Sequence, residues 1–263
     1  MELLQGQYRR GIYGKACQVK AYKGWGTSGR IQVVKLLALE SSSELFTAAL
    51  YLDGRIIERE GARGDSHSEI ALPLVKGLLD EQKTVLADLD GIVFGAGPGA
   101  FTGLRLACSV AQGLAIGADL PVLGIGSLEA LALGAGDGFV YVCTDARMRE
   151  VYSAAYRVCG DSVVTIMAPV VSAPAAVPLP AGVGWLGRGS GFAAYADALA
   201  ERLGAQVTSV DPDARPRADT LLRLAAPRFT RGEGFDAALA APLYVRDKVA
   251  MTTRERIAQG GKA

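Results

Sequence analysis

The chain has few of the residues that build metal centres and disulfide frameworks. Its 263 residues include one histidine, His67, and four cysteines, at positions 17, 108, 143 and 159, with no CxxC spacing among them. A single imidazole without paired thiols predicts no metal site. Scattered cysteines in apolar surroundings are typical of buried free thiols, which favour a reducing, cytoplasmic compartment.

Long apolar runs are also missing. The longest uncharged stretch, residues 162–187, contains four prolines, which a membrane-spanning helix hardly tolerates. We interpret this stretch as an irregular connection. The basic N-terminus is followed by glycine- and tyrosine-rich polar sequence rather than an apolar segment. We therefore expect no secretory signal and no membrane association.

The chain lacks a strong charge of either sign. Its net charge is +1, but residues 1–35 carry seven Lys/Arg and one acid, so the remainder has a net charge of −5. An acidic body without RRM or KH signatures disfavours a stand-alone nucleic-acid binder. We interpret residues 1–34 as a loosely structured extension and residues 251–263 as a basic tail.

Half of the residues are hydrophobic and one in eight is glycine, so the chain predicts a globule with many tight turns. Strands are expected at 35–39, 45–52 and 55–59, with Asp53-Gly54 forming the last hairpin. A helix is expected over 70–79, with Ser66 and Glu69 forming a capping box. Pro73 inside it predicts either a kink or a later start.

The pattern continues with a strand at 91–94, a helix at 101–117, a strand at 122–125 and a helix at 127–133 capped by Ser127. A second half opens at 139–144 and repeats the first. Residues 47–54 and 153–160 match in pattern, and each follows an apolar strand that ends in a carboxylate, Glu40 or Asp145. This duplication predicts an α/β protein with an N-terminal lobe over 35–134 and a C-terminal lobe over 135–250.

Duplicated units of this order resemble the actin-like ATPases (the ASKHA, RNase H-like fold). In that fold the first carboxylate and its turn handle Mg²⁺ and phosphate. Here the turn is Glu40-Ser41-Ser42, with Glu in place of Asp and no glycine, and Arg147-Met148 fill the second copy. We therefore expect a degenerate nucleotide cleft, no cofactor and no tight binding of ATP.

A glycine loop lies between the predicted strand 91–94 and the helix 101–117. Gly97 and Gly99 flank Pro98 there, and their N–H groups at a helix N-terminus could hold an anion. The alternative is that the glycines only permit a tight turn between strand and helix. The spacing leaves both possibilities open.

Several motifs occur in a fixed order between residues 35 and 250: LLALESS, HSEIALP, GAGPGAFTGLR, PVLGIGSLEAL, DARMREVY and PLYVRDKVA. This series resembles the TsaB (YeaZ) family, the dimerisation subunit of the bacterial complex that makes N6-threonylcarbamoyladenosine (t6A) in tRNA. The chain departs from the family pattern at Glu40, Ala96, Ala100 and Arg149, where the family has Asp, Arg, Ser and Gly.

The resemblance implies a two-lobed, non-catalytic paralogue of TsaD, the subunit that transfers the threonylcarbamoyl group. The implied partners are a TsaD homologue in a heterodimer, a TsaE homologue, a second copy of the chain when TsaD is absent, and tRNA only through the complex. The alternative is an active enzyme, either an ASKHA-type ATPase or kinase or a peptidase. A peptidase would need His67 and a neighbouring serine as base and nucleophile, whereas we interpret His67 as a hydrogen-bonded residue at a helix start.

The helix at 101–117 is apolar on nearly every side, so it is expected to be buried on more than one side. Either the sheet and the 70–79 helix cover it fully, or a partner does. The resemblance implies that these two helices form half of a four-helix interface. The candidate interface residues are His67, Ile70, Leu74, Leu78, Leu104, Cys108, Ala111 and Ala115. We expect a charge at Leu74 or Leu104 to disrupt assembly without unfolding the chain.

Overall fold

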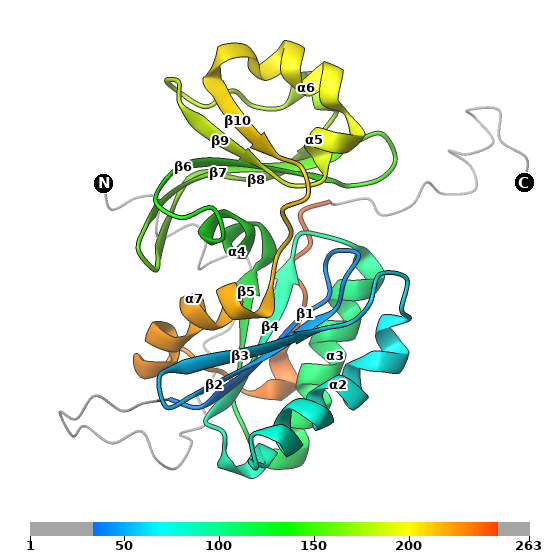
Figure 1. Cartoon of the computed structure of the whole chain (residues 1–263), viewed down its shortest axis with the longest axis vertical. Coiled ribbons are helices and arrows are strands. Elements are labelled where there is room, and N and C mark those ends of the chain that lie inside the picture. Colours follow the sequence, from blue (N-terminus) through cyan, green and yellow to red (C-terminus); the bar gives the residue numbers. More distant parts are fainter. Residues whose placement is uncertain (1–33, 247–263) are drawn as a thin grey trace, which may run out of the picture.

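The computed structural model describes residues 34–246. The predicted extension up to residue 33 and the basic tail at 251–263 lie outside the described residues. Within this range the chain forms two sheets, one in each lobe, stacked along the long axis of the molecule (Figure 1).

The first sheet has five strands: β1 (Leu36–Glu40), β2 (Thr47–Leu52), β3 (Arg55–Glu60), β4 (Gly91–Gly97) and β5 (Val122–Gly126). Their order is β3-β2-β1-β4-β5. The first three strands are antiparallel, and β4 lies parallel to both β1 and β5. Asp53 and Gly54 close the β2–β3 hairpin with positive φ values of 51° and 78°, which confirms the predicted turn.

The second sheet repeats this topology. Its strands are β6 (Gly138–Asp145), β7 (Val151–Cys159), β8 (Ser162–Ser172), β9 (Trp185–Arg188) and β10 (Val207–Asp211). The order β8-β7-β6-β9-β10 matches the first sheet strand for strand, including the antiparallel and parallel pairings. The predicted duplication and the two-lobed actin-like ATPase fold are therefore confirmed.

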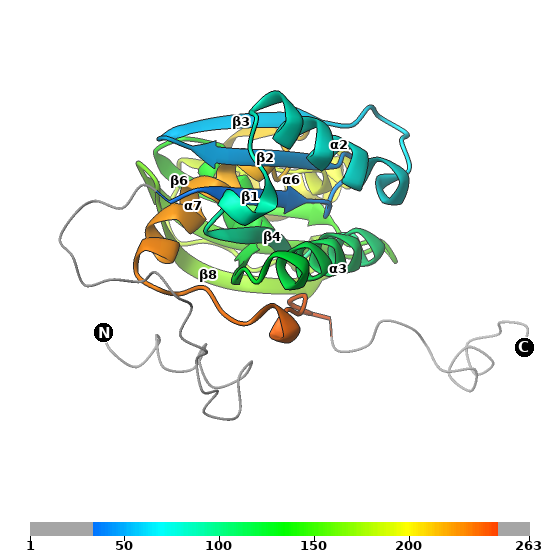
Figure 2. The ribbon, with the colours of Figure 1, turned by 90° about the horizontal axis from the view of Figure 1, so that it is seen from below.

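The helices of the described chain cover both sheets. They are α2 (His67–Glu81), α3 (Phe101–Ala118), α4 (Ser127–Leu133), α5 (Gly191–Ala194), α6 (Ala196–Leu203) and α7 (Ala218–Thr230), with single 3-10 turns η1 (Leu86–Asp88), η2 (Pro174–Ala176), η3 (Gly204–Gln206) and η4 (Ala237–Leu239). In Figure 2, α2 and α3 lie side by side against the first sheet. The hydrophobic core beneath them includes Phe46, Phe94 and Ala107.

The last helix of each repeat packs against the other lobe. Helix α4 follows β5 but contacts β6, β7 and β8, and α7 follows β10 but contacts β1, β2 and β4. The two helices also touch each other, and their apolar side chains join one core between the sheets. The two lobes therefore share one hydrophobic core across the boundary that the sequence predicts at residues 134 and 135.

The stretch that we expected to be irregular, 162–187, contains strand β8 and the start of β9. The prolines in this stretch led us to expect a loop where the chain forms a strand. β8 is the outermost strand of its sheet, and Pro169 falls where the pairing with β7 shifts register between Ala155 and Ser153. Because an edge strand or a bulge does not need every N–H group, proline is tolerated at this position.

Helix α2 begins differently from the prediction. Ser66 is the N-cap residue, but its hydroxyl lies 3.1 Å from the hydroxyl of Ser68 and makes no capping bond, so the predicted capping box is wrong. The helix begins at His67 and runs on through Pro73, which excludes the later start. The side chain of His67, described below, fixes this end of the helix instead.

Candidate functional site

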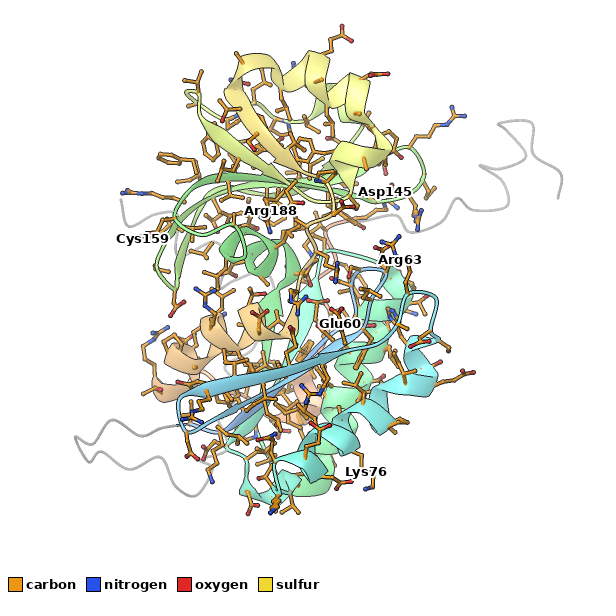
Figure 3. All side chains as sticks on the ribbon, in the orientation of Figure 1. Glu60, Arg63, Lys76, Asp145, Cys159 and Arg188 are labelled. Carbon is orange, nitrogen blue, oxygen red and sulfur yellow. The ribbon has the colours of Figure 1, made fainter. Side chains whose placement is uncertain are left out.

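A cleft of about 800 Å³ lies between the two lobes. The first lobe contributes the loop after β1 and the N-terminal turn of α3, and the second lobe contributes the turn after β6 and part of α5. Arg63 and Asp145 line the cleft from opposite lobes and are labelled in Figure 3. Its lining includes Ser42 and Gly99, two of the residues that the sequence predicts for a degenerate nucleotide cleft.

Glu40, at the end of β1, lies outside the lining of this cleft. Its side chain is completely buried, and it accepts hydrogen bonds from the Ser42 N–H at 2.6 Å and the Ser127 hydroxyl at 3.0 Å. It also fills the space above Gly95, where a Cβ would lie 2.1 Å from its Oε2. Burial raises the pKa of Glu40, while the hydrogen bonds from Ser42 and Ser127 lower it. This carboxylate joins three segments of the first lobe and presents no oxygen to a ligand in the cleft.

The glycines of the loop before α3 make room for the turn after β1. A Cβ on Gly99 would lie 2.5 Å from the Ser42 Cβ, and one on Gly103 would lie 1.8 Å from the Ser41 carbonyl oxygen. The Ala100 N–H donates to the Ser42 carbonyl at 2.9 Å, which holds the two segments together. The geometry therefore favours close packing over an anion site as the reason for these glycines.

Ser127 has a different role from the one predicted. Gly126 occupies the N-cap position of α4, and Ser127 makes no capping bond. Its hydroxyl donates to Glu40 and accepts from the Gly97 N–H at 3.2 Å. Gly97 has a φ of +104°, which strongly favours glycine. Ser127 thus links the carboxylate turn to the glycine loop.

His67 is fully hydrogen-bonded. Its Nδ1 lies 2.8 Å from the Ser41 hydroxyl and its Nε2 lies 3.2 Å from the Glu44 carbonyl oxygen. The carbonyl can only accept, which assigns the proton to Nε2 and makes Nδ1 the acceptor for Ser41. Ser41 is completely buried, so this pair offers no accessible nucleophile. The two serines next to His67 in the sequence, Ser66 and Ser68, hydrogen-bond each other.

The second lobe carries the corresponding turn after β6. Asp145 accepts the Arg147 N–H at 2.8 Å and pairs with the Arg147 guanidinium at 3.2 Å. Arg147, Met148 and Arg149 have φ values of 60°, 55° and 61°, so three consecutive non-glycine residues adopt the left-handed conformation. We call residues 146–150 the αL turn. Ala146, Arg147 and Met148 of this turn line the cleft.

A second glycine loop faces this turn, and the sequence analysis missed it. Gly187 at the end of β9, Gly189 after it and Gly191 at the start of α5 have the spacing of Gly95, Gly97 and Gly99, and a Cβ on Gly191 would lie 2.9 Å from the Cys143 carbonyl oxygen. The Ser190 hydroxyl lies 3.1 Å from the Asp145 N–H. A search for glycine at alternate positions after a strand would have found this loop. Both lobes therefore place a carboxylate turn against a glycine loop.

The predicted interface residues mostly face the core of the first lobe. The buried members, none more than 5% exposed, are Leu78, Leu104, Cys108, Ala111 and Ala115. Ile70 and Leu74 are half-buried against the same core, and His67 is half-buried beside Ser41. The stripe that we selected from the sequence is thus the inner one. Hydrophobicity alone could not identify it, because apolar residues surround all but a narrow stripe of α3.

The outer face of α3, at Thr102, Arg105, Ser109, Gly113 and Ile116, is polar or small except for Ile116. Ile116 is 61% exposed there, and Leu72 of the neighbouring helix α2 is 53% exposed. Leu239 of η4 and Tyr244 are further exposed apolar side chains next to α3. Helix α3 is long and apolar enough to span a membrane by length and composition alone, and 33% of it is buried in the fold. In the folded lobe α3 packs against β4 and α2.

Two lobes of identical topology, each placing a carboxylate turn against a glycine loop, define a member of the actin-like ATPase class with degenerate phosphate turns. A family model described as "TsaD: tRNA N6-adenosine threonylcarbamoyltransferase" matches residues 62–254. The "tRNA threonylcarbamoyladenosine biosynthesis protein TsaB" of Escherichia coli is 31% identical over 230 residues, which cover 82% of this chain and 96% of that protein. The Haemophilus influenzae protein of the same name is 39% identical over 126 residues, 46% of this chain and 53% of its own length.

The solved structure "YeaZ from Pseudomonas aeruginosa" is 36% identical and matches with a TM-score of 0.74, covering 80% of this chain and 99% of that one. A second structure, of an uncharacterized protein with similarity to peptidase YEAZ from the same organism, is 37% identical with a TM-score of 0.75, covering 81% and 100%. The chain belongs to the TsaB (YeaZ) family, as its motifs predicted.

Proposed function

We propose that this chain is a non-catalytic subunit of the machinery that forms t6A in tRNA, and that it supports a TsaD-type catalytic subunit by docking to it. The relatives named as tRNA threonylcarbamoyladenosine biosynthesis proteins support the pathway. In this proposal a TsaE homologue is a further partner, tRNA is contacted only through the complex, and the chain works in the cytoplasm. A second copy takes the place of the TsaD-type subunit when that subunit is absent.

The observation that carries the proposal is the uncovered outer face of α3. We call this surface, with Leu72, Ile116, Leu239 and Tyr244 as its exposed apolar side chains, the α3 face. Exposed apolar side chains set among small and polar positions are typical of protein contact surfaces. The inner side of α3 lies on the first sheet, so the outer side is the one open to a partner. Ser109 and Gly113 are also exposed on this helix, and such small residues permit close approach of a second helix.

A non-catalytic role is supported by the buried positions of Glu40 and Ser41. Glu40 would have to leave three internal contacts before it could bind Mg²⁺ in the cleft. Ser41 would have to leave a completely buried position before it could attack a peptide. Both movements would break the packing of the turn after β1 against the glycine loop. We therefore prefer a subunit role over an ATPase, a kinase or a peptidase.

The test is to place a charge on the α3 face and measure binding to a purified TsaD-type subunit by calorimetry. Ile116→Glu and Leu72→Glu should each weaken binding by about a hundredfold or more, because a carboxylate would be buried in the interface without a partner. Val183→Glu is the matched control, since Val183 is 72% exposed in the second lobe, away from α3. It should bind like the unchanged chain.

Circular dichroism of the same variants separates binding from folding. Ile116→Glu should keep its structure, whereas Leu104→Glu should unfold or lose several degrees in melting temperature, because Leu104 is 2% exposed. Equal binding by Ile116→Glu, Val183→Glu and the unchanged chain would refute the proposed docking surface.

A further inference from the structure

The segment at residues 243–246, which we call the strap, joins the two lobes across the cleft. At its start the Leu243 N–H donates to the Ala96 carbonyl of β4 at 2.7 Å. A Cβ on Gly97 would lie 3.2 Å from the Leu243 carbonyl oxygen, so the strap passes close to this glycine. At its end Arg246 reaches the αL turn of the second lobe. The strap also lines the cleft.

The first lobe holds the strap at the N-terminal turn of α3. The Arg105 Nε donates to the Tyr244 hydroxyl at 3.1 Å, and the Arg105 guanidinium lies 3.8 Å from the centroid of the Phe101 ring. The rings of Phe101 and Tyr244 are 5.7 Å apart. Arg105 and Tyr244 are both exposed, and Tyr244 belongs to the α3 face. A partner that covers this face therefore meets the anchor of the strap.

The second lobe holds the strap through one side chain. Arg246 donates to the Ala146 carbonyl at 3.2 Å and to the Glu150 carboxylate, and its other terminal nitrogen lies 3.5 Å from the Met148 sulfur. The side chain is only 14% exposed. Arg246 thus contacts the beginning, the middle and the end of the αL turn at once.

The αL turn depends on such support. Inside it, the Ala146 N–H donates to the Glu150 carbonyl at 2.9 Å, and the Glu150 N–H donates to the Arg147 carbonyl at 3.0 Å. Three consecutive non-glycine residues with positive φ are strained, and strain of this kind persists only where neighbouring contacts impose it. Arg246 comes from a segment almost a hundred residues away in the sequence and supplies such contacts.

We propose that the strap couples the α3 face to the αL turn, so that a partner docking on α3 also fixes the shape of the cleft mouth. This proposal rests on the proposed function for the identity of the partner, but not for the coupling itself. Contacts with Arg105 and Tyr244 stabilise the strap, and the strap stabilises the αL turn through Arg246. Because coupling between two sites is reciprocal, loosening the turn also weakens docking.

The coupling is tested first in the full chain alone, by hydrogen exchange at the amides of Ala146 and Glu150. Arg246→Gln should raise their exchange by about tenfold, and Arg105→Gln and Tyr244→Phe by about threefold, because each removes one connection of the strap. Lys76→Gln is the control for loss of a surface charge, since Lys76 pairs with Asp80 of the same helix, α2, far from the strap. It should leave the exchange of the turn unchanged.

The decisive comparison is Arg105→Gln against Lys76→Gln, because Arg105 belongs to the first lobe and the turn to the second. If both variants exchange like the unchanged chain at residues 146 and 150, the coupling is refuted. Adding a TsaD-type subunit should slow exchange at these amides in the unchanged chain and much less in Arg105→Gln. If the subunit does not bind at all, the proposed function fails, and the exchange of the free variants still decides the coupling.

Discussion

The turn after β1 and the turn after β6 occupy equivalent positions in two lobes of identical topology, yet they are built in opposite ways. In the turn after β1 the Glu40 carboxylate is buried and accepts hydrogen bonds from Ser42 and Ser127, while only the residues after it line the cleft. The Asp145 turn borders the cleft and is held from outside by Arg246. One copy has become a structural element of its own lobe. The other remains exposed and depends on a distant segment.

Replacing the two carboxylates by alanine should show the difference between the two turns most clearly, as unequal losses in the free energy of unfolding. Glu40→Ala should lower the free energy of unfolding by about 4 kcal/mol, because it leaves a cavity and two buried donors without an acceptor. Asp145→Ala should cost only about 1 kcal/mol, since it removes one turn hydrogen bond, a long hydrogen bond from the Tyr195 hydroxyl at 3.4 Å and an ion pair with the exposed Arg147. Urea denaturation of both variants measures the difference. Equal losses would contradict the contrast between the turns.

The buried carboxyl of Glu40 also predicts a pH dependence. Its pKa is raised above the ordinary value of 4.5 mainly by burial. The folded state therefore holds the proton more tightly than the unfolded state, so this group's contribution to stability falls as the pH rises above about 4.5. Glu40→Gln keeps the shape and removes the titration.

The measurement is the unfolding free energy of the unchanged chain and of Glu40→Gln at pH 5 and pH 8. The unchanged chain should lose stability relative to Glu40→Gln between these two values. Other titrating groups cancel in the comparison, because both proteins contain them. A relative gain in stability with rising pH would show that hydrogen bonding, rather than burial, dominates at Glu40.

Much of the fold could be predicted because it follows from short-range sequence patterns, in which apolar strands, turns and helices alternate. The carboxylates Glu40 and Asp145, each following an apolar strand and preceding a hairpin, indicate the duplication. Strand β8 was missed because its prolines and lack of charge resemble a loop, and only its place at the sheet edge explains Pro169. The position of a strand in its sheet depends on how all the strands pair, which the local sequence does not show.

The site was harder to predict, because it depends on direction and distance. Leu104 and Ile116 are both apolar residues of α3, and only the packed sheet shows that Leu104 points inward and Ile116 outward. Arg246 and Glu150 are 96 residues apart, so no local pattern could connect them. Hydrophobicity singled out α3, and only the three-dimensional packing shows which of its residues are exposed.

The central claim is that this chain works through the α3 face and not through the Glu40 turn. The direct measurement is t6A formation in a reconstituted reaction with a TsaD-type subunit and a TsaE homologue, with Glu40→Gln or Ile116→Glu replacing the unchanged chain. Glu40→Gln should keep the rate within about twofold, and Ile116→Glu should lower it by more than about tenfold at limiting concentration, because only the second variant loses docking. Loss of the rate in Glu40→Gln with full activity in Ile116→Glu would contradict the account.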